Sequence, residues 1–333
     1  MRATAVGTIP ESFRYVALDV PTADGFLTRL WLVDLTGGRG PVVVADWEAP
    51  ASPAGGYSAS ADGRTVLVAA TGSRSRVALY LLRPELGTTS VLFEEPGWIA
   101  LSPALSADGA VFAFTRYPDG GGSDDGLYAG PIAGGEPRRI VAPDPQAIAP
   151  PLALGWSFDA AWLAYLRTRG SSDVVLAHRS GGSGAEIGPG DRVSWRRDPP
   201  QLLVAANGSG ADPSRIYTYE LATAAKVEVA RVERAFFSFV QWHPHFDRFI
   251  YVESTDRGRE ASGGIWIRNA DGSAPTRFDL GSGAYAPEWS RDGTLVTALT
   301  GGDDSIVRLI ELFTGRQVAV LCRRGGTPPA DCV

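Results

Sequence analysis

Histidine and cysteine side chains carry much of the metal-binding and nucleophilic chemistry of proteins, and this sequence has few of them. Its three histidines are His178, His243 and His245, and the last two flank Pro244. A metal centre needs several His, Cys or carboxylate ligands that converge on one point. Histidines spaced in this way do not supply such a cluster, so we expect no histidine metal site and no cofactor.

The two cysteines, Cys322 and Cys332, both lie close to the C-terminus. A bond between them would close a short loop and contribute about 2–3 kcal/mol to stability. Pairing requires an oxidising compartment, and two unpaired thiols in a C-terminal tail are the alternative. Both interpretations stay open at the level of the sequence.

A serine hydrolase would require a nucleophile on a sharp elbow, a histidine base and an acid that orients the base. No Gly-x-Ser-x-Gly motif occurs; the segment 56–60, Gly-Tyr-Ser-Ala-Ser, comes nearest and lies in a predicted β-strand. We therefore expect no peptidase activity from this chain alone and name no catalytic residue.

Paired aspartates offer the better candidates for a cation. Asp124 with Asp125, and Asp303 with Asp304, lie in Gly-rich segments and could give carboxylate oxygens to calcium. Neither segment has the twelve-residue loop with ligands at alternating positions. The alternative is that both pairs are solvated acidic loops.

Composition excludes several classes of protein. The chain has 333 residues, 44% of them hydrophobic, and 31 basic against 37 acidic side chains give a net charge of −6. This sign is unfavourable for a protein that binds nucleic acid. No uncharged apolar stretch reaches the length of about 18 residues that a membrane span needs. The N-terminus lacks the apolar core of a secretory signal, so the compartment is cytoplasmic, or periplasmic or extracellular if a signal was trimmed.

The elements that would position any site are repeats of about 46 residues. Each copy has a tryptophan or small apolar residue, a polar residue, Asp-Gly or a substitute, and then an alternating apolar run. The copies begin at Ala59, Leu105, Trp156, Trp195, Trp242 and Trp289.

Each copy continues with a second alternating strand, a Gly-rich hairpin turn and a short final strand, which makes four antiparallel strands. Residues 13–44 resemble the second to fourth strands of a further, atypical copy. A four-stranded unit cannot bury both faces alone, so the sequence predicts an all-β chain that forms a single β-propeller. We expect seven blades over residues 1–321, beginning near 1, 47, 94, 142, 188, 231 and 279, followed by a tail at 322–333. A six-bladed ring with an appended N-terminal set of strands is the alternative.

The pattern Trp-Ser-x-Asp-Gly, followed by an apolar strand, an aliphatic-aromatic strand and a Gly-Gly hairpin, resembles the TolB-like, WD-repeat-like β-propellers of bacteria. This resemblance implies a binding platform, a protein scaffold or an accessory domain of a peptidase, since the family includes all three. It also includes pectin-fragment lyases that hold a metal through a histidine cluster. Three copies depart from this motif: His245 replaces the aspartate in one, and Ala160 and Pro199 replace the glycine in two others.

The recurring residues have structural explanations. A tryptophan in one column of the first strand fills the wedge between neighbouring blades, so we expect these rings in the core. The aspartates lie where the first strand turns into the second, and an Asx bond to the backbone explains them without a ligand. The tryptophans are Trp156, Trp195, Trp242 and Trp289, and the aspartates are Asp62, Asp108, Asp159, Asp198 and Asp292.

A binding site is expected at the long-loop end of the blades, which we define as the end that carries two kinds of loop. One joins the second and third strands, and the other enters the next blade; the prediction includes loops Pro21–Thr28 and 142–150. These loops combine arginines with aromatic residues, a composition that is enriched at interfaces. The candidate binding residues are Trp47, Tyr57, Trp98, Arg116, Tyr117, Arg167, Arg169, Arg215, Arg234, Phe236, Arg257 and Tyr285.

The sequence therefore predicts a non-enzymatic binding or scaffold propeller that engages a protein or a carbohydrate through these loops. One alternative is a hydrolase or lyase with a site at the propeller axis, built from acidic and arginine side chains. Another is a structural subunit of a larger assembly. The identity of the ligand and the oligomeric state remain open.

Overall fold

The structure is a computed structural model of the chain. It describes residues 1–22, 25–48, 56–71, 77–120, 126–182, 184–209, 212–255, 264–279, 284–300 and 306–322. Both aspartate pairs considered for calcium, together with Arg257 and Cys332, lie outside this part of the chain, as does the side chain of Cys322. Among the described residues, no helix is long and apolar enough to cross a membrane.

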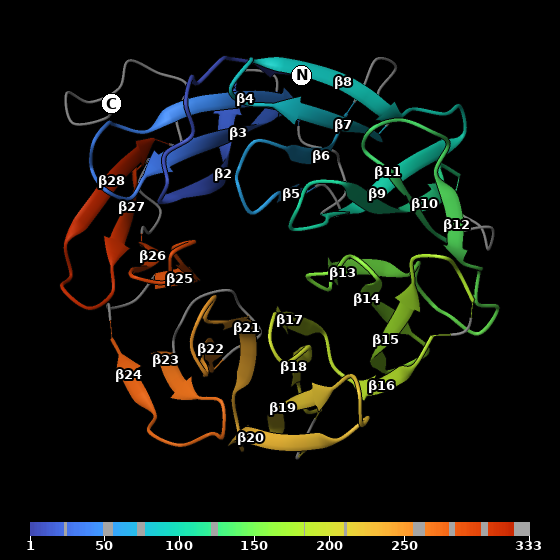
Figure 1. The fold of residues 1–333 in the computed structure, drawn as a ribbon, viewed down its shortest axis with the longest axis vertical. Coiled ribbons are helices and arrows are strands. Elements are labelled where there is room, and N and C mark those ends of the chain that lie inside the picture. The colour runs from blue at the N-terminus through green and yellow to red at the C-terminus, as the bar shows by residue number, and fades with distance from the viewer. Residues whose placement is uncertain are drawn as a thin grey trace. The chain divides into compact units, whose positions relative to one another are not determined.

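The regular structure consists of strands, which form seven four-stranded sheets that we call blades 1 to 7 (Figure 1). Blade 1 contains β1 (Arg2–Ala3), β2 (Phe13–Thr22), β3 (Gly25–Asp34) and β4 (Val42–Glu48), and blade 2 contains β5 (Tyr57–Ala59), β6 (Val66–Thr71), β7 (Val77–Arg83) and β8 (Thr88–Phe93). Blade 3 contains β9 (Trp98–Leu105), β10 (Val111–Pro118), β11 (Gly126–Pro131) and β12 (Arg138–Val141), and blade 4 contains β13 (Leu152–Trp156), β14 (Trp162–Thr168), β15 (Ser172–His178) and β16 (Glu186–Pro189).

The remaining three blades follow the same order along the chain. Blade 5 contains β17 (Arg192–Arg196), β18 (Gln201–Ala206), β19 (Ser214–Glu220) and β20 (Lys226–Val232). Blade 6 contains β21 (Phe236–Trp242), β22 (Arg248–Ser254), β23 (Gly264–Asn269) and β24 (Thr276–Phe278), and blade 7 contains β25 (Ala284–Trp289), β26 (Val296–Thr300), β27 (Ile306–Glu311) and β28 (Gln317–Cys322). This confirms the predicted all-β fold, a seven-bladed β-propeller, and the six-bladed alternative is wrong.

The chain divides into two compact units, which are described separately. Unit 1 comprises Met1–Glu11, Tyr15–Leu32 and Val42–Gly188, and unit 2 comprises Ser12–Arg14, Val33–Pro41 and Pro189–Val333. Blades 2 to 4 lie in unit 1, apart from the last residue of β16, and blades 5 to 7 lie in unit 2.

The core lies between successive sheets. In unit 1, Leu127 and Ile140 of blade 3 pack in one cluster with Trp156 and Tyr165 of blade 4. In unit 2, blades 5 and 6 share a similar cluster. The second strands β6, β18 and β22 are therefore buried on both faces, and each carries a continuous apolar run instead of an alternating one. Trp156, Trp195, Trp242 and Trp289 are all buried, which confirms the prediction that this column belongs to the core.

The turns that join the first and second strands of a blade, which we call the anchor turns, are held by hydrogen bonds from their own side chains. In blade 3, Ser106 Oγ donates to Asp108 Oδ1 at 2.6 Å and accepts the amide of Val111, while Asp108 accepts the amide of Ala110. The hydrogen bond from Ser106, aided by that amide, lowers the pKa of Asp108. The same arrangement recurs at Asp62, Asp159 and Asp292, which confirms the predicted Asx turns at these four aspartates. The prediction was wrong for Asp198, because the residue two positions on, Pro200, has no N–H to donate. Ala160 adopts φ 54° where the other three copies have glycine at about 70°.

Blade 1 differs from the prediction in the order of its strands. Its sheet order is β1-β4-β3-β2, so β2, β3 and β4 are the first three strands, and the N-terminal β1 supplies the fourth by pairing with β4. β2 lies against the first strand of blade 2, because Tyr57 Oη donates to the carbonyl of Tyr15 at 2.9 Å. The loop Pro21–Thr28 thus joins first and second strands, which is the tight-turn position, and not the long-loop position that was predicted.

In the anchor turn of blade 6, the buried His243 occupies the position that serine has in blades 2, 3, 4 and 7. His243 Nδ1 accepts the amides of His245 and Phe246, both at 2.9 Å, so Nε2 carries the proton and donates to the Gly293 carbonyl at 3.0 Å. Burial lowers the pKa of His243 to about 4. His243 and His245 therefore belong to a structural turn, and both ring nitrogens of His243 are engaged in it.

This histidine predicts a loss of stability in acid. Because the folded-state pKa lies below the value of about 6.5 in an unfolded chain, the contribution of neutral His243 is complete above pH 6.5 and is lost as the pH falls to about 4. The shift corresponds to about 3 kcal/mol. Urea unfolding at pH 7 and at pH 4 measures this loss. The decrease in the free energy of unfolding between the two pH values should be smaller for His243→Asn than for the wild type, by about 3 kcal/mol. Equal differences in the two proteins would contradict this role of His243.

Candidate functional site

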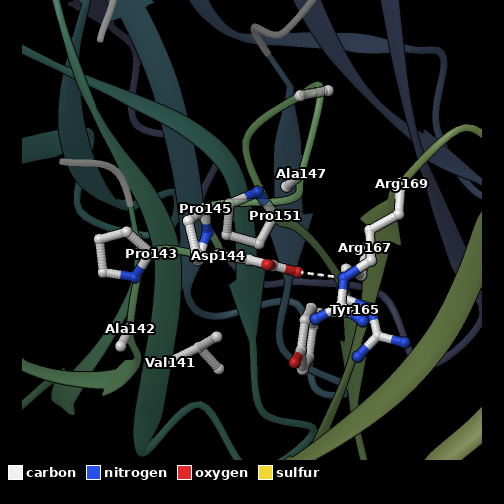
Figure 2. A pocket seen from close by; sticks show the side chains of 11 residues that line it. Val141, Ala142, Pro143, Asp144, Pro145, Ala147, Pro151, Tyr165, Arg167 and Arg169 are labelled. Atoms are coloured by element: carbon white, nitrogen blue, oxygen red, sulfur yellow. Dashed lines mark hydrogen bonds and ion pairs between the residues drawn. The ribbon is translucent and has the colours of Figure 1, made fainter. Parts of the chain in front are cut away.

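A pocket of about 300 Å³ opens at the long-loop end of blade 4 (Figure 2). It lies between loop 142–151, which enters β13, and the end of β14. Two of the predicted binding residues, Arg167 and Arg169, line it together. Its lining consists of Val141, Ala142, Pro143, Asp144, Pro145, Ala147, Ala149, Pro151, Tyr165, Arg167 and Arg169.

The loop that forms one wall is held by backbone bonds around Asp144. The side chain of Asp144 accepts the amide of Gln146 and its carbonyl accepts the amide of Ala147, both at 3.0 Å. The amide of Ile148 then donates to the carbonyl of Thr168 at the end of β14, at 2.9 Å. Four prolines, at 143, 145, 150 and 151, restrict φ in the same loop. The wall is therefore preformed, although it contains no regular secondary structure.

The two arginines of the pocket have different partners. Arg169 Nε donates to Asp144 Oδ2 at 2.6 Å across the pocket, and this bond holds the pKa of Asp144 below its usual value. Arg167 Nη2 bonds Glu186 at 2.5 Å and lies 3.8 Å from Asp173, and the bond to Glu186 raises the pKa of Arg167 further. Arg167 is mostly buried, and its Nε has no hydrogen-bond partner. Both guanidinium groups are thus charged and fixed in place.

Tyr165 forms part of the floor of the pocket. Its side chain is buried in the cluster shared by blades 3 and 4, and burial raises the pKa of its hydroxyl. The phenol is therefore neutral at pH 7. Among the described lining residues there is no histidine, cysteine, serine or lysine that could act as a base or nucleophile. Two charged planar groups, one carboxylate and apolar walls are suited to holding a ligand.

A second pair of predicted residues meets at the same end of blade 3. The guanidinium carbon of Arg116 lies 3.7 Å from the ring centroid of Trp98, and Phe93 and Tyr128 also flank it. Glu95 accepts two hydrogen bonds from Arg116, at 2.8 and 2.7 Å. The aromatic cage is therefore filled by the chain's own cation.

The other predicted binding residues do not join these clusters. In unit 1, Trp47 is buried in the core, Tyr57 is used in the bond to β2, and Tyr117 is half-buried in β10. In unit 2, Arg215 forms an ion pair with Glu228 at 3.5 Å, and Arg234 is exposed in the turn before β21. Phe236 and Tyr285 are half-buried at or near the starts of β21 and β25.

Sequence reasoning missed Asp144 and Glu186 as partners of the arginines, and Tyr165 as a lining residue. Loop 142–150 was expected at this end of the blade, but nothing in its composition distinguished Asp144 from other exposed acids. No metal centre was predicted from the histidines, and in the parts of the chain that the structure describes no group of three or more His, Cys, Asp or Glu side chains could hold a metal ion. His178 bonds Ser180 through Nδ1, far along the chain from His243.

Comparisons with known proteins bear on the fold. No family model matches the sequence, and no curated protein sequence matches it. A solved prolyl endopeptidase matches with a TM-score of 0.66 and 13% identity over 96% of this chain and 50% of that chain. TolB from Acinetobacter baumannii matches with a TM-score of 0.52 and 16% identity over 78% of this chain and 62% of that one. An oligogalacturonate lyase in complex with manganese matches with a TM-score of 0.63 and 11% identity over 89% and 95% of the two chains.

The fold is a TolB-like β-propeller. At these identities the likeness extends to the fold alone, and two of the similar proteins are different enzymes, a prolyl endopeptidase and an oligogalacturonate lyase. The chain spans about half of the prolyl endopeptidase and less than two thirds of the Acinetobacter TolB. Among the described residues, the TolB-like propeller offers no ligand set that fits manganese. The function must therefore be argued from the pocket of blade 4.

Proposed function

We propose that this TolB-like propeller is a non-enzymatic binding protein that holds its ligand in the blade-4 pocket. The observation that carries the proposal is the convergence of Arg167 and Arg169 with a proline-rich, preformed loop around one cavity. Long loops on a rigid scaffold are the usual place for recognition. The arginine of blade 3 is enclosed by its own rings, so the blade-4 pocket is the open counterpart at this end of unit 1.

The proposal predicts binding that depends on this pocket. Immobilised protein should select ligands from a random peptide library or an oligosaccharide array, and Ala149→Trp, which fills the cavity, should abolish their binding. Arg215→Ala is the matched control, because Arg215 lies in unit 2 and is also an exposed arginine at a strand end. Its ligands should be those of the wild type. Selected ligands that bind Ala149→Trp as tightly as the wild type would overturn the proposal.

A lyase is the second candidate, because the oligogalacturonate lyase structure matches over nearly its full length. The described residues speak against the same metal chemistry, since they contain no fitting group of ligands. Incubation of the purified protein with oligogalacturonate and manganese provides the direct test. Cleavage that is lost on chelation would replace the binding proposal by this one.

A further inference from the structure

Blades 3 and 4 place an arginine at the same position of their second strands. In β10, Thr115 pairs with Leu101 of the first strand and Arg116 follows; in β14, Leu166 pairs with Leu152 and Arg167 follows. Both guanidinium groups lie at the long-loop end of their blade, and the Nε atom of each is buried without a hydrogen bond. The two blades therefore share one structural position and can be compared residue by residue.

The surroundings of the two arginines differ in the presence of aromatic rings. In blade 3, Trp98 covers the face of Arg116 at 3.7 Å, and Tyr128 on the neighbouring strand lies 5.4 Å away. Counted back from Leu101 and Leu152, the residue that corresponds to Trp98 is Ala149. Counted from the partners of the two arginines on the third strand, Gly126 and Asp173, the residue that corresponds to Tyr128 is Val175.

Blade 4 thus keeps the arginine and lacks the rings that cover it. Ala149 is exposed and lines the pocket together with Arg167, so the cavity lies where blade 3 has the indole of Trp98. Carboxylates hold both arginines. Glu186 and Asp173 pair with Arg167, as Glu95 pairs with Arg116 in blade 3. Its guanidinium plane is positioned without the ring that would stack on it.

Resting on the proposed function, we infer that the blade-4 pocket takes an aromatic side chain of a partner protein, whose ring stacks on Arg167 as Trp98 stacks on Arg116. A guanidinium plane attracts the face of an aromatic ring, and the attraction is strongest for an indole. Pro143, Pro145 and Pro151 supply apolar walls around such a ring (Figure 2).

The rim of the pocket favours a protein over a sugar as the source of the ring. Ile148, between two lining alanines, is 73% exposed and offers an apolar contact to residues beside the inserted side chain. The polar groups of the pocket are already used in internal pairs, Arg169 with Asp144 and Arg167 with Glu186. Asp144, the one carboxylate among the lining residues, already accepts hydrogen bonds from Arg169 and Gln146, so fewer of its lone pairs are left for sugar hydroxyls.

The test uses two small probes that differ in the ring. N-acetyl-tryptophanamide and N-acetyl-leucinamide are titrated into the full chain, and binding is followed by ligand-observed NMR. The tryptophan probe is expected to bind about tenfold more tightly than the leucine probe. Arg167→Lys keeps the charge but removes the plane, and should reduce this preference to about twofold or less. Arg116→Lys is the matched control, because the ring of Trp98 already covers that position, and it should leave the preference intact.

Ala149→Trp gives a second, independent readout. It places the indole of blade 3 in blade 4, so it should abolish binding of the tryptophan probe and raise the melting temperature. Equal affinity of the two probes for the wild type, no binding of either, or an unchanged preference in Arg167→Lys would overturn the inference. Pocket-dependent ligands without an aromatic group would overturn it and leave the proposed function standing, whereas the absence of any pocket-dependent ligand would remove both.

Discussion

Replacement of Arg14 by leucine is expected to lower the free energy of unfolding by about 3–5 kcal/mol. Arg14 is buried at the start of β2, where it donates to the carbonyl and the hydroxyl of Thr297, each at 3.0 Å, and pairs with Glu288 at 2.9 Å. All of these groups belong to unit 2, where Arg14 ties the segment Ser12–Arg14 to β25 and β26. Leucine would leave buried acceptors without a donor and Glu288 without its cation.

Equilibrium unfolding in urea measures this loss. Arg29→Leu is the matched control: Arg29 pairs with Asp46 at 2.8 Å, but both side chains are about a quarter exposed. Its loss should be about 1 kcal/mol. If the two leucine variants were equally stable, the contacts of Arg14 could not have the role that the structure gives them.

Trp289→Ala is expected to destabilise the protein by about 3–5 kcal/mol. The ring is 5% exposed, lies edge-on to His243 at 4.4 Å, and has the guanidinium of Arg248 above it at 5.2 Å. Its indole nitrogen makes no hydrogen bond. The stabilisation therefore comes from volume and ring contacts, so Trp289→Phe should cost less, about 1–2 kcal/mol.

Chemical denaturation of both variants distinguishes a packing role from any role of the indole nitrogen. The account predicts a clear gap between alanine and phenylalanine. Equal destabilisation by the two substitutions would show that the volume of the ring at position 289 does not contribute to the stability of the protein.

Much of the fold could be predicted because most blades repeat the same sequence pattern, which forms the same turn and the same packing. The Ser-x-Asp pattern bonds its own turn, and the tryptophan column fills the wedge beside it, so several copies together specify four-stranded units. Blade 1 was assigned wrongly because it has neither the tryptophan nor the Ser-x-Asp-Gly turn. Blades 2 and 3 also lack the tryptophan, but their Ser-x-Asp-Gly turns identify the first strand. The segment 22–25, Thr-Ala-Asp-Gly, has the spacing of the anchor turn and was the signal that could have corrected the strand order.

The candidate site was predicted only in part, for a different physical reason. Arg167 and Arg169 carry a visible signal, since long polar side chains in loops are typical of recognition surfaces. The pocket itself depends on a small residue, Ala149, at a position where blade 3 has Trp98. A small residue leaves a cavity only where the equivalent residue of another blade is large. The two residues can be recognised as equivalent only when the strand registers of both blades are known.

The most direct measurement of the central claim is the NMR signal of the Arg167 Nε–H group during titration with N-acetyl-tryptophanamide. This group is buried and free of hydrogen bonds, so a ring stacked on the guanidinium must change its shielding. The account predicts a progressive upfield shift for Arg167 and none for Arg116, whose face is already covered. A constant Arg167 signal at saturating probe, or equal shifts of both arginines, would contradict it.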